Sequence, residues 1–261
     1  MDYSMGRQQI VTLARFTLLE AVRTRLMWLF VVTLGAVYGI AYFAQQLAIT
    51  ESARVQIVFS AAASRLVAVF VLSLFILTSL VREFNDKGLE LTLSFDLRRS
   101  DYILGRLLGF ILIAFAMALI AGLPQVLLAP LPAALQWGAS LALELMIIAA
   151  LSLFCIVTFT QLMPAASFVA GFYLLARTMS TIRLISDTSV VGDNVQSRQI
   201  LAWLVDGFAL VLPAFDRFSQ SAWLADGAAG WSELGACAVQ ATLYTALLGA
   251  AAMFDFYRRN L

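Results

Sequence analysis

The sequence predicts an all-α, polytopic membrane protein with six transmembrane helices preceded by an amphipathic helix, and three observations lead to this fold class. Hydrophobic residues make up 62% of the 261 positions and charged residues only 13%, whereas about 25% of a typical soluble chain is charged. The mean hydropathy is +0.89. The apolar residues are gathered into long runs, and a helix needs roughly 20 mostly apolar residues to cross a bilayer. A single transmembrane domain therefore accounts for the whole chain, and no second large domain fits.

Residues 7–25 predict an amphipathic helix that lies at the membrane interface. Apolar residues recur there at helical spacing, with charged residues largely on the opposite side. The apolar positions are Ile10, Leu13, Ala14, Thr17, Leu18 and Ala21, and the charged ones are Arg7, Arg15, Glu20 and Arg23.

The six spans follow from long apolar runs that contain few charges. Proline marks two of the breaks between them, at residues 130–132 and 161–164, because proline lacks an N–H donor and disfavours helix in the residue before it. Three glycines, Gly105, Gly109 and Gly122, are interpreted as positions where helices approach closely. The expected spans are residues 26–47, 57–81, 107–128, 136–160, 164–183 and 234–256.

The distribution of lysine and arginine predicts the orientation. Four basic residues precede the first span, five lie in the segment 82–106 after the second span, and two follow the sixth, all on one side of the membrane. The positive-inside rule assigns that side to the cytoplasm. Both chain termini are therefore expected in the cytoplasm, and residues 184–233 form an expected extracytoplasmic cap with short helices.

Several classes of function are disfavoured by the composition. The chain has no histidine, which removes the commonest general base and metal ligand, so no catalytic residue and no metal site is expected. Its two cysteines, Cys155 and Cys237, lie in apolar runs and offer neither a disulfide framework nor a thiolate cluster. The only lysine, Lys87, follows Asp86 and is not part of a phosphate-binding Gly-Lys-Ser/Thr motif. The chain is expected to be no enzyme, to hold no cofactor and to bind no nucleic acid.

The most informative segment is residues 82–106, REFNDKGLELTLSFDLRRSDYILGR. Acidic and basic residues alternate along it, and Leu89, Leu91 and Leu93 keep it partly apolar. The chemistry of these residues leaves two interpretations open, a solvated loop and a docking surface for a soluble partner.

This segment resembles the first cytoplasmic loop of ABC-transporter permeases of the type-two exporter class. The resemblance includes an acidic start, Gly88, Glu90, the Leu93–Ser94 pair, Arg99 and the stretch 102–106. Residues 10–28 resemble the amphipathic elbow helix with which the family opens, residues 256–261 resemble its tail, and a Leu-Pro followed by Asp216-Arg217-Phe218 matches loosely before the sixth span. Within the family, the sequence is most similar to permeases associated with copper-enzyme maturation.

The resemblance implies a transport subunit in a bacterial plasma membrane, the inner membrane. A separate ATP-binding subunit, in two copies, would carry ATP and Mg²⁺, and a second permease chain would complete a homodimer. The transporter would be an exporter. The loop would contain a coupling helix that docks into the ATPase through residues Glu83, Asp86, Gly88, Glu90, Leu91, Ser94 and Arg99. Two alternatives of other classes remain, an ion-coupled secondary transporter and a non-transporting membrane scaffold.

Three charges are expected inside the spans, Arg65, Glu144 and Arg177. Arg65 lies eight residues after Ile57 and Glu144 seven after Trp137, which puts both at about 11 Å from the outer ends of their spans at 1.5 Å per residue. Charges left alone in lipid are costly and usually mark a pair or a pathway. Glu144 could pair with Arg65 or with Arg177, and the alternative is that each long side chain reaches the interface by itself.

Overall fold

The computed structural model describes residues 3–47, 51–85, 99–187, 207, 212–218, 222–225 and 231–258. In these residues the chain is helical, with short turns between the helices. The helices are α1 (Tyr3–Arg23), α2 (Leu26–Leu47), α3 (Ser52–Asn85), α5 (Arg99–Leu128), α6 (Leu131–Phe159), α7 (Leu162–Asp187), α9 (Phe215–Phe218), α10 (Ala222–Ala225) and α11 (Trp231–Arg258).

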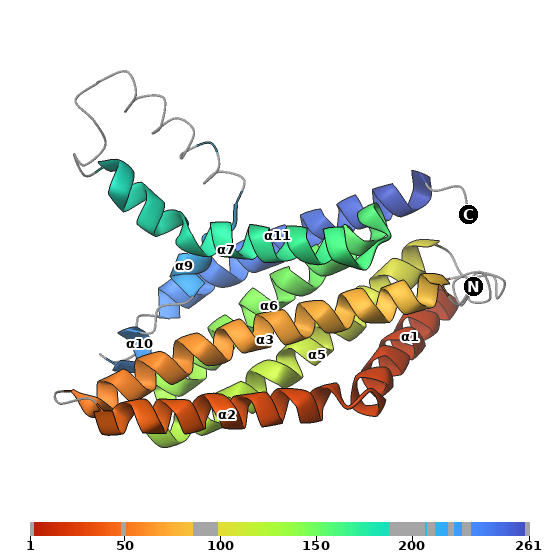
Figure 1. Ribbon diagram of the computed structural model, residues 1–261. Coiled ribbons are helices and arrows are strands. Elements are labelled where there is room, and N and C mark those ends of the chain that lie inside the picture. The colour runs from red at the N-terminus through yellow and green to blue at the C-terminus, as the bar shows by residue number, and fades with distance from the viewer. Residues whose placement is uncertain are drawn as a thin grey trace.

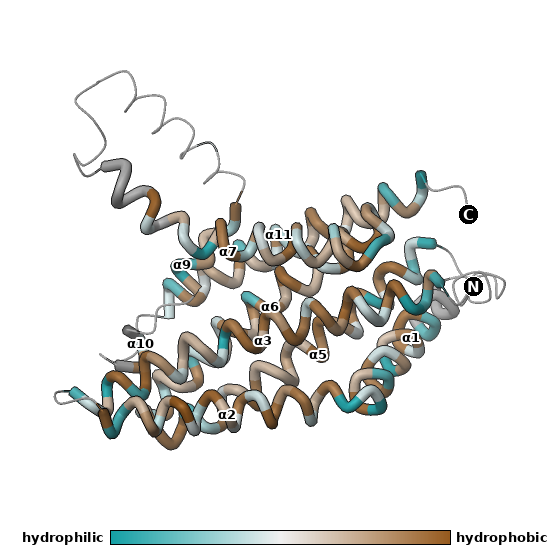
Figure 2. Tube along the Cα trace, in the orientation of Figure 1, coloured by the Kyte–Doolittle hydropathy of each residue, from teal (hydrophilic) through white to brown (hydrophobic). Residues whose placement is uncertain are grey.

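Six helices of the described part of the chain are long and apolar enough to cross a membrane: α2, α3, α5, α6, α7 and α11. This confirms the fold class expected from the sequence, and the protein is a multi-pass membrane protein. Hydrophobic residues cover the middle of the helices, and hydrophilic residues gather toward their ends and along α1 (Figure 2).

The long helices run alternately up and down, so that several chain segments meet at one end of the bundle. The start of α1, the end of α3, the start of α5 and the end of α11 all lie at that end, on the right in Figure 1. The described arginines Arg82, Arg99, Arg106 and Arg258 lie at that end, and the positive-inside rule predicts that it faces the cytoplasm. We refer to it as the basic end.

Helices α3, α5, α6, α7 and α11 extend beyond the spans expected from hydropathy. Helix α3 continues to Asn85 and α5 begins at Arg99, so both enter the segment 82–106 that was expected to be a loop. The 34 residues of α3 measure about 51 Å at 1.5 Å per residue, well over the roughly 30 Å of a hydrocarbon core. Hydropathy marks where lipid ends, whereas the helix continues as long as its charged residues find partners.

The prolines near the expected breaks lie at helix starts. Pro130 caps α6 and a second proline, Pro132, lies in the first turn, where a missing N–H is tolerated. Helix α6 ends at Phe159, and the next residue, Thr160, caps it: Thr160 adopts a left-handed conformation (φ 59°) and donates its N–H to the carbonyl of Ile156. Helix α7 starts two residues later and carries Pro164 in its first turn. Tight turns therefore join α5 to α6 and α6 to α7.

Helix α6 is the centre of the bundle. It packs against α3, α5, α7 and α11, and it is the most deeply buried of the six long apolar helices in the described part of the chain. Helix α2 lies at the periphery, where it packs mainly on α3 (Figure 1). A buried polar residue on α6 is therefore shielded from lipid by its neighbours.

The expected cap at 184–233 falls largely on residues outside the described ranges. Helix α7 continues into it as far as Asp187, and the short α9 and α10 belong to it. Helix α9 packs against α6, α7 and α11, and α10 against α3 and α6. Their aromatic residues Phe215, Phe218 and Trp223 are buried against the long helices.

Candidate functional site

The amphipathic helix α1 is joined to the first span by a sharp bend. Helix α1 ends at Arg23 and α2 begins at Leu26, and Arg25 between them has a φ of 58°. A residue other than glycine adopts this left-handed conformation rarely, and at a cost of order 1 kcal/mol or more. The bend turns α1 away from the axis of α2, as the elbow expected from the sequence would require (Figure 1).

Two glycines on α5 let α1 approach closely. A Cβ atom built on Gly109 would lie 2.6 Å from the Cβ of Thr17, and one built on Gly105 would lie 2.8 Å from the Cδ2 of Leu13. Ordinary side chains at these two positions would push α1 away from α5. Both glycines are therefore positions of close helix packing, and the helix that packs against them is α1.

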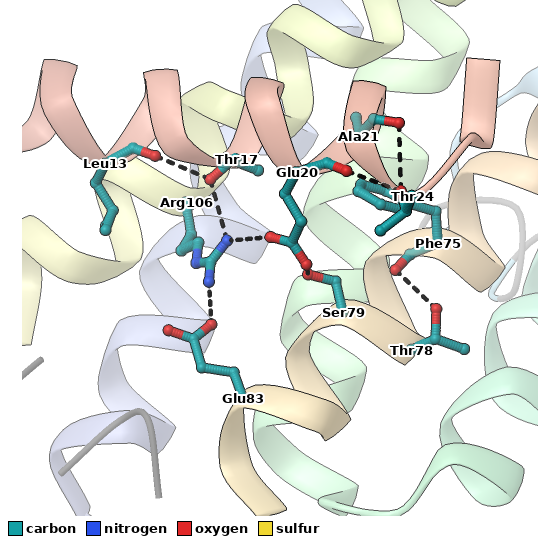
Figure 3. A network of polar contacts seen from close by, with 10 residues as sticks. All are labelled: Leu13, Thr17, Glu20, Ala21, Thr24, Phe75, Thr78, Ser79, Glu83 and Arg106. Carbon is teal, nitrogen blue, oxygen red and sulfur yellow. Dashed lines mark hydrogen bonds and ion pairs between the residues drawn. The ribbon is translucent and has the colours of Figure 1, made fainter. Parts of the chain in front are cut away.

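Between these glycines lies Arg106, the centre of a polar cluster that joins three helices (Figure 3). Its Nη1 donates to Thr17 Oγ1 and to Glu20 Oε2 on α1, each at 3.1 Å. Its Nη2 donates to the Glu83 carboxylate on α3. Ser79 of α3 donates its hydroxyl to the second oxygen of Glu20 at 2.6 Å. We call these five residues the elbow network.

The elbow network is a partly buried, charge-assisted arrangement. The side chains of Arg106, Glu83 and Glu20 are 10%, 13% and 29% exposed. Hydrogen bonds between ionised groups are about twice as strong as neutral ones, and one guanidinium here serves two carboxylates on different helices. The network therefore ties α1 to both α3 and α5 at the basic end.

The structure describes two of the seven residues expected to contact an ATPase. Glu83 lies near the end of α3 and binds Arg106, and Arg99 is the first residue of α5. A docking role for either residue stays a prediction. The other five, Asp86, Gly88, Glu90, Leu91 and Ser94, lie outside the described residues.

A second polar cluster lies inside the membrane-spanning part of the bundle. Arg65 of α3 donates Nη1 to Glu144 Oε2 of α6 at 2.6 Å, and both side chains are fully buried. The other nitrogen, Nη2, donates to Ser140 Oγ at 2.6 Å and to the Trp137 carbonyl at 3.3 Å. The guanidinium also lies over the Trp137 ring, 4.9 Å from its centre.

The remaining oxygen of Glu144 is bound from α7. Tyr173 donates its hydroxyl to Glu144 Oε1 at 3.0 Å and accepts a hydrogen bond from Arg177 Nη1 at 2.9 Å. The same Arg177 nitrogen is 3.6 Å from Glu144 Oε1. All three charges expected inside the spans are thus brought together, and we call this group the intramembrane cluster.

The intramembrane cluster holds two arginines and one carboxylate, so the carboxylate is fully engaged. Within this cluster, Arg65 Nε and Trp137 Nε1 are buried without a hydrogen-bond partner. In a low-dielectric interior such a cluster fixes the mutual rotation of α3, α6 and α7, because turning any one of them would strand a buried charge. Its geometry suits a structural role, in which it holds these three helices together.

The described residues contain no group of three or more potential metal-ligating residues of the types His, Cys, Asp and Glu. Cys155 and Cys237 are both free and buried.

The elbow network was not expected from the sequence. Glu20 was expected on the charged side of an interfacial helix, and Arg106 was expected as a cytoplasmic arginine at the end of the segment 82–106. A usable signal exists in the spacing: Thr17 and Glu20 are three residues apart and so share a helix face, and Arg106 lies between Gly105 and Gly109 on the helix that must receive that face.

No protein-family model and no curated protein matches the chain.

Proposed function

We propose that the chain is the transmembrane permease subunit of an ABC transporter of the exporter type, located in a bacterial plasma membrane. ATP hydrolysis would take place in a separate subunit that docks on the segment between α3 and α5. Six helices able to cross a membrane supply the transmembrane part of this proposal. The observation that carries it is the position of the elbow network relative to the docking segment.

The elbow network lies close to both ends of that segment in the sequence. Glu83 is three positions before residue 86, and Arg106 is eight positions after residue 98. Through Arg106, the helix ends on both sides of the segment, on α3 and on α5, are connected to α1 (Figure 3). A force applied to residues 86–98 by a nucleotide-driven partner would therefore move α1, α3 and α5 together.

The proposal includes a homodimer of permease chains with two ATP-binding subunits. Six spans would form half of a pathway, and a twofold pair would present two docking segments to two ATPases. ATP and Mg²⁺ would be bound by the partner, since the chain has no phosphate-binding lysine motif.

The intramembrane cluster supports this reading over an ion-coupled secondary transporter. A coupling ion needs a carboxylate that it can reach and exchange, whereas both oxygens of Glu144 are bound by arginine or tyrosine. A coupling ion would have to displace an arginine from a fully buried pair. A membrane scaffold without transport activity is the other alternative, and a transport assay separates it from a permease.

The first test is purification of the full chain from its own host membranes in a mild detergent, followed by native mass spectrometry. We expect two permease chains with two copies of an ATP-binding cassette protein. After reconstitution of this complex in nanodiscs, ATP hydrolysis and substrate-dependent stimulation are measured. Recovery of the intact chain without any such ATPase, or with one permease copy per assembly, would overturn the proposal.

Two variants test which residues dock the ATPase and which residue couples its ATP hydrolysis to transport. Glu90→Lys reverses a charge in the docking segment and should reduce the amount of ATPase that co-purifies. Arg106→Gln should leave the ATPase bound but uncouple its hydrolysis from transport, because α1 is no longer tied to the segment. Glu233→Lys is the matched control, since Glu233 is exposed at the start of α11, at the opposite end of the bundle. Equal effects of Glu90→Lys and Glu233→Lys would argue against docking on residues 86–98.

A further inference from the structure

A groove runs along the outside of the bundle between the α1–α2 bend and helix α3. Its volume is about 570 Å³, within the range of sites that hold small organic ligands. One wall comes from α1 and α2, and the other from α3. The lining includes Arg25, Trp28 and Val32 on the side of the bend and α2, and Leu74, Thr78 and Arg82 on α3. We call it the elbow groove.

The elbow groove changes character along its length. On α3 its lining passes from Val71 and Leu74 to Thr78 and then Arg82, over eleven positions or about 16 Å at 1.5 Å per residue. On the antiparallel α2 it runs in the opposite sense, from Val32 back to the arginine at the bend. The polar end is therefore at the basic end of the bundle, and the apolar end points toward the middle of the membrane.

The apolar walls face outward from the bundle. Trp28 is 71% exposed, Val32 66% and Leu74 50%. In a multi-pass membrane protein such residues lie against lipid tails, and a tryptophan near the basic end fits the interfacial position that this residue favours. The walls suit a hydrocarbon chain.

The charge at the polar end is positive. The carboxylate of Glu20 is bound by Arg106 and Ser79, and the lining of the groove holds this one negative charge against the two positive charges of Arg25 and Arg82. Arg25 and Arg82 are exposed, and within the described residues neither forms an ion pair. The two threonine hydroxyls of the lining donate to carbonyls of their own helices, Thr24 to Glu20 and Thr78 to Phe75 (Figure 3). The charged donors available to a ligand are therefore the guanidinium groups of Arg25 and Arg82.

The backbone at the bend points to the same conclusion. Arg25 has a φ of 58°, a conformation that glycine or asparagine would adopt at lower cost. Strain of this kind is retained where a side chain is needed at that place. Here it places a guanidinium at the mouth of a groove with apolar walls.

We infer that the elbow groove binds an anionic phospholipid from the leaflet at the basic end, with its phosphate at Arg25 and Arg82 and an acyl chain along α2 and α3. Guanidinium groups are the preferred partners of phosphate, and a net negative headgroup balances the two arginines better than a zwitterionic one. The bound lipid would bridge the α1–α2 bend and α3 beside the elbow network. This inference depends on the membrane-spanning fold and not on the proposed ATPase partner, so either can fail alone.

The test uses the full chain in nanodiscs made of equal parts phosphatidylglycerol and phosphatidylcholine. The protein is released into detergent, and native mass spectrometry counts the lipids that it retains. We expect the wild type to retain phosphatidylglycerol in preference to phosphatidylcholine. Each basic residue near an anionic membrane contributes about fivefold to binding, so Arg25→Gln and Arg82→Gln should each lower this preference about fivefold and the double variant roughly 30-fold.

Two further variants make the assignment specific. Arg258→Gln removes an exposed arginine from α11 at the same end of the bundle and should leave lipid retention unchanged. Leu74→Trp fills the apolar wall without changing charge, and it should abolish retention of the lipid. Because Arg82 and Leu74 are exposed, both single variants are expected to fold, which is checked by size-exclusion chromatography.

Three results would overturn the inference. The first is equal retention of the two lipids by the wild type, and the second is an equal loss of preference in Arg258→Gln and Arg82→Gln. The third is unchanged retention in Leu74→Trp together with displacement of the bound species by inorganic phosphate. That last result would mean that the arginines hold a free phosphate and that the groove holds no acyl chain.

Discussion

Arg65 and Glu144 form an ion pair across α3 and α6, with 2.6 Å between Nη1 and Oε2 and no exposure of either side chain. The two residues are 79 positions apart in the chain, so the pair forms only when the second and fourth spans have packed together. In the middle of a membrane bundle, this contact ties the rotation of one helix to that of the other.

Glu144→Gln should strongly destabilise the protein. The substitution leaves Arg65 fully buried without a counter-ion, and breaking a buried pair in this way costs about 3–5 kcal/mol. Unfolding in detergent, followed by heat or by added sodium dodecyl sulfate, measures the loss. Glu233→Gln, at an exposed carboxylate on α11, is the matched control and should change stability by less than about 0.5 kcal/mol.

Double-mutant cycles should show that Glu144 is coupled more strongly to Arg65 than to Arg177. Arg65 is closer and fully buried, whereas Arg177 is 3.6 Å away and its side chain is 20% exposed. Contacting residues typically show coupling of about 0.5–3 kcal/mol. Purely additive effects in both cycles would mean that the three charges act independently.

Tyr173→Phe should cause a smaller loss of stability, about 1–3 kcal/mol, because its hydroxyl joins Glu144 Oε1 to Arg177 and is buried with them. The ring is retained, so its packing on Phe215 is unaffected. Tyr257→Phe removes a hydroxyl from an exposed tyrosine on α11 and serves as the control. A loss no larger than that of the control would remove Tyr173 from the intramembrane cluster.

Arg106→Gln should loosen α1 from the bundle. The variant leaves the carboxylates of Glu20 and Glu83 without their shared partner, and we expect faster hydrogen–deuterium exchange of the amides of α1 than of α11. Arg106→Lys should rescue only part of the effect, because the guanidinium donates from two nitrogens to two carboxylates and an ammonium group is a single point charge. Unchanged exchange in α1 would show that packing alone holds it in place.

Gly109→Ala should be destabilising although alanine is the better helix former. Its Cβ would lie 2.6 Å from the Cβ of Thr17, a branched residue close to the backbone. Overpacking of this kind typically costs about 1–3 kcal/mol. Gly35→Ala on α2, where nothing lies within 4 Å of the new atom, should cause no loss. Gly105→Ala should fall between them, since its nearest neighbour is the end of the flexible Leu13 side chain.

The sequence could predict the six spans because the membrane itself imposes the rule. A spanning helix must be long and apolar and must satisfy its own backbone hydrogen bonds, and each of these conditions is local. Proline at 130–132 and at 161–164 indicated the tight turns, because its effect on a helix is local as well. The ends of α3 and α5 were less predictable, because Glu83 and Arg106 belong to helices whose charged ends are held by tertiary contacts and not by hydropathy.

For the intramembrane cluster, the sequence placed Arg65 and Glu144 at the same depth, since depth follows from counting residues along a helix. It left pairing, competition by Arg177 and snorkelling open. Depth says nothing about which way a side chain points around the helix axis, or about which helices are neighbours. The packing of α3, α6 and α7 decided that Glu144 contacts both arginines.

The sequence by itself determined that this protein crosses a membrane repeatedly and which residues must avoid lipid. Only the tertiary structure decided what those residues do, as the elbow network shows. Helical periodicity puts Thr17 and Glu20 on one face of α1, but it names no partner for that face. The partner is Arg106, because Gly105 and Gly109 allow α1 to reach α5, and close approach between two helices is a property of the pair.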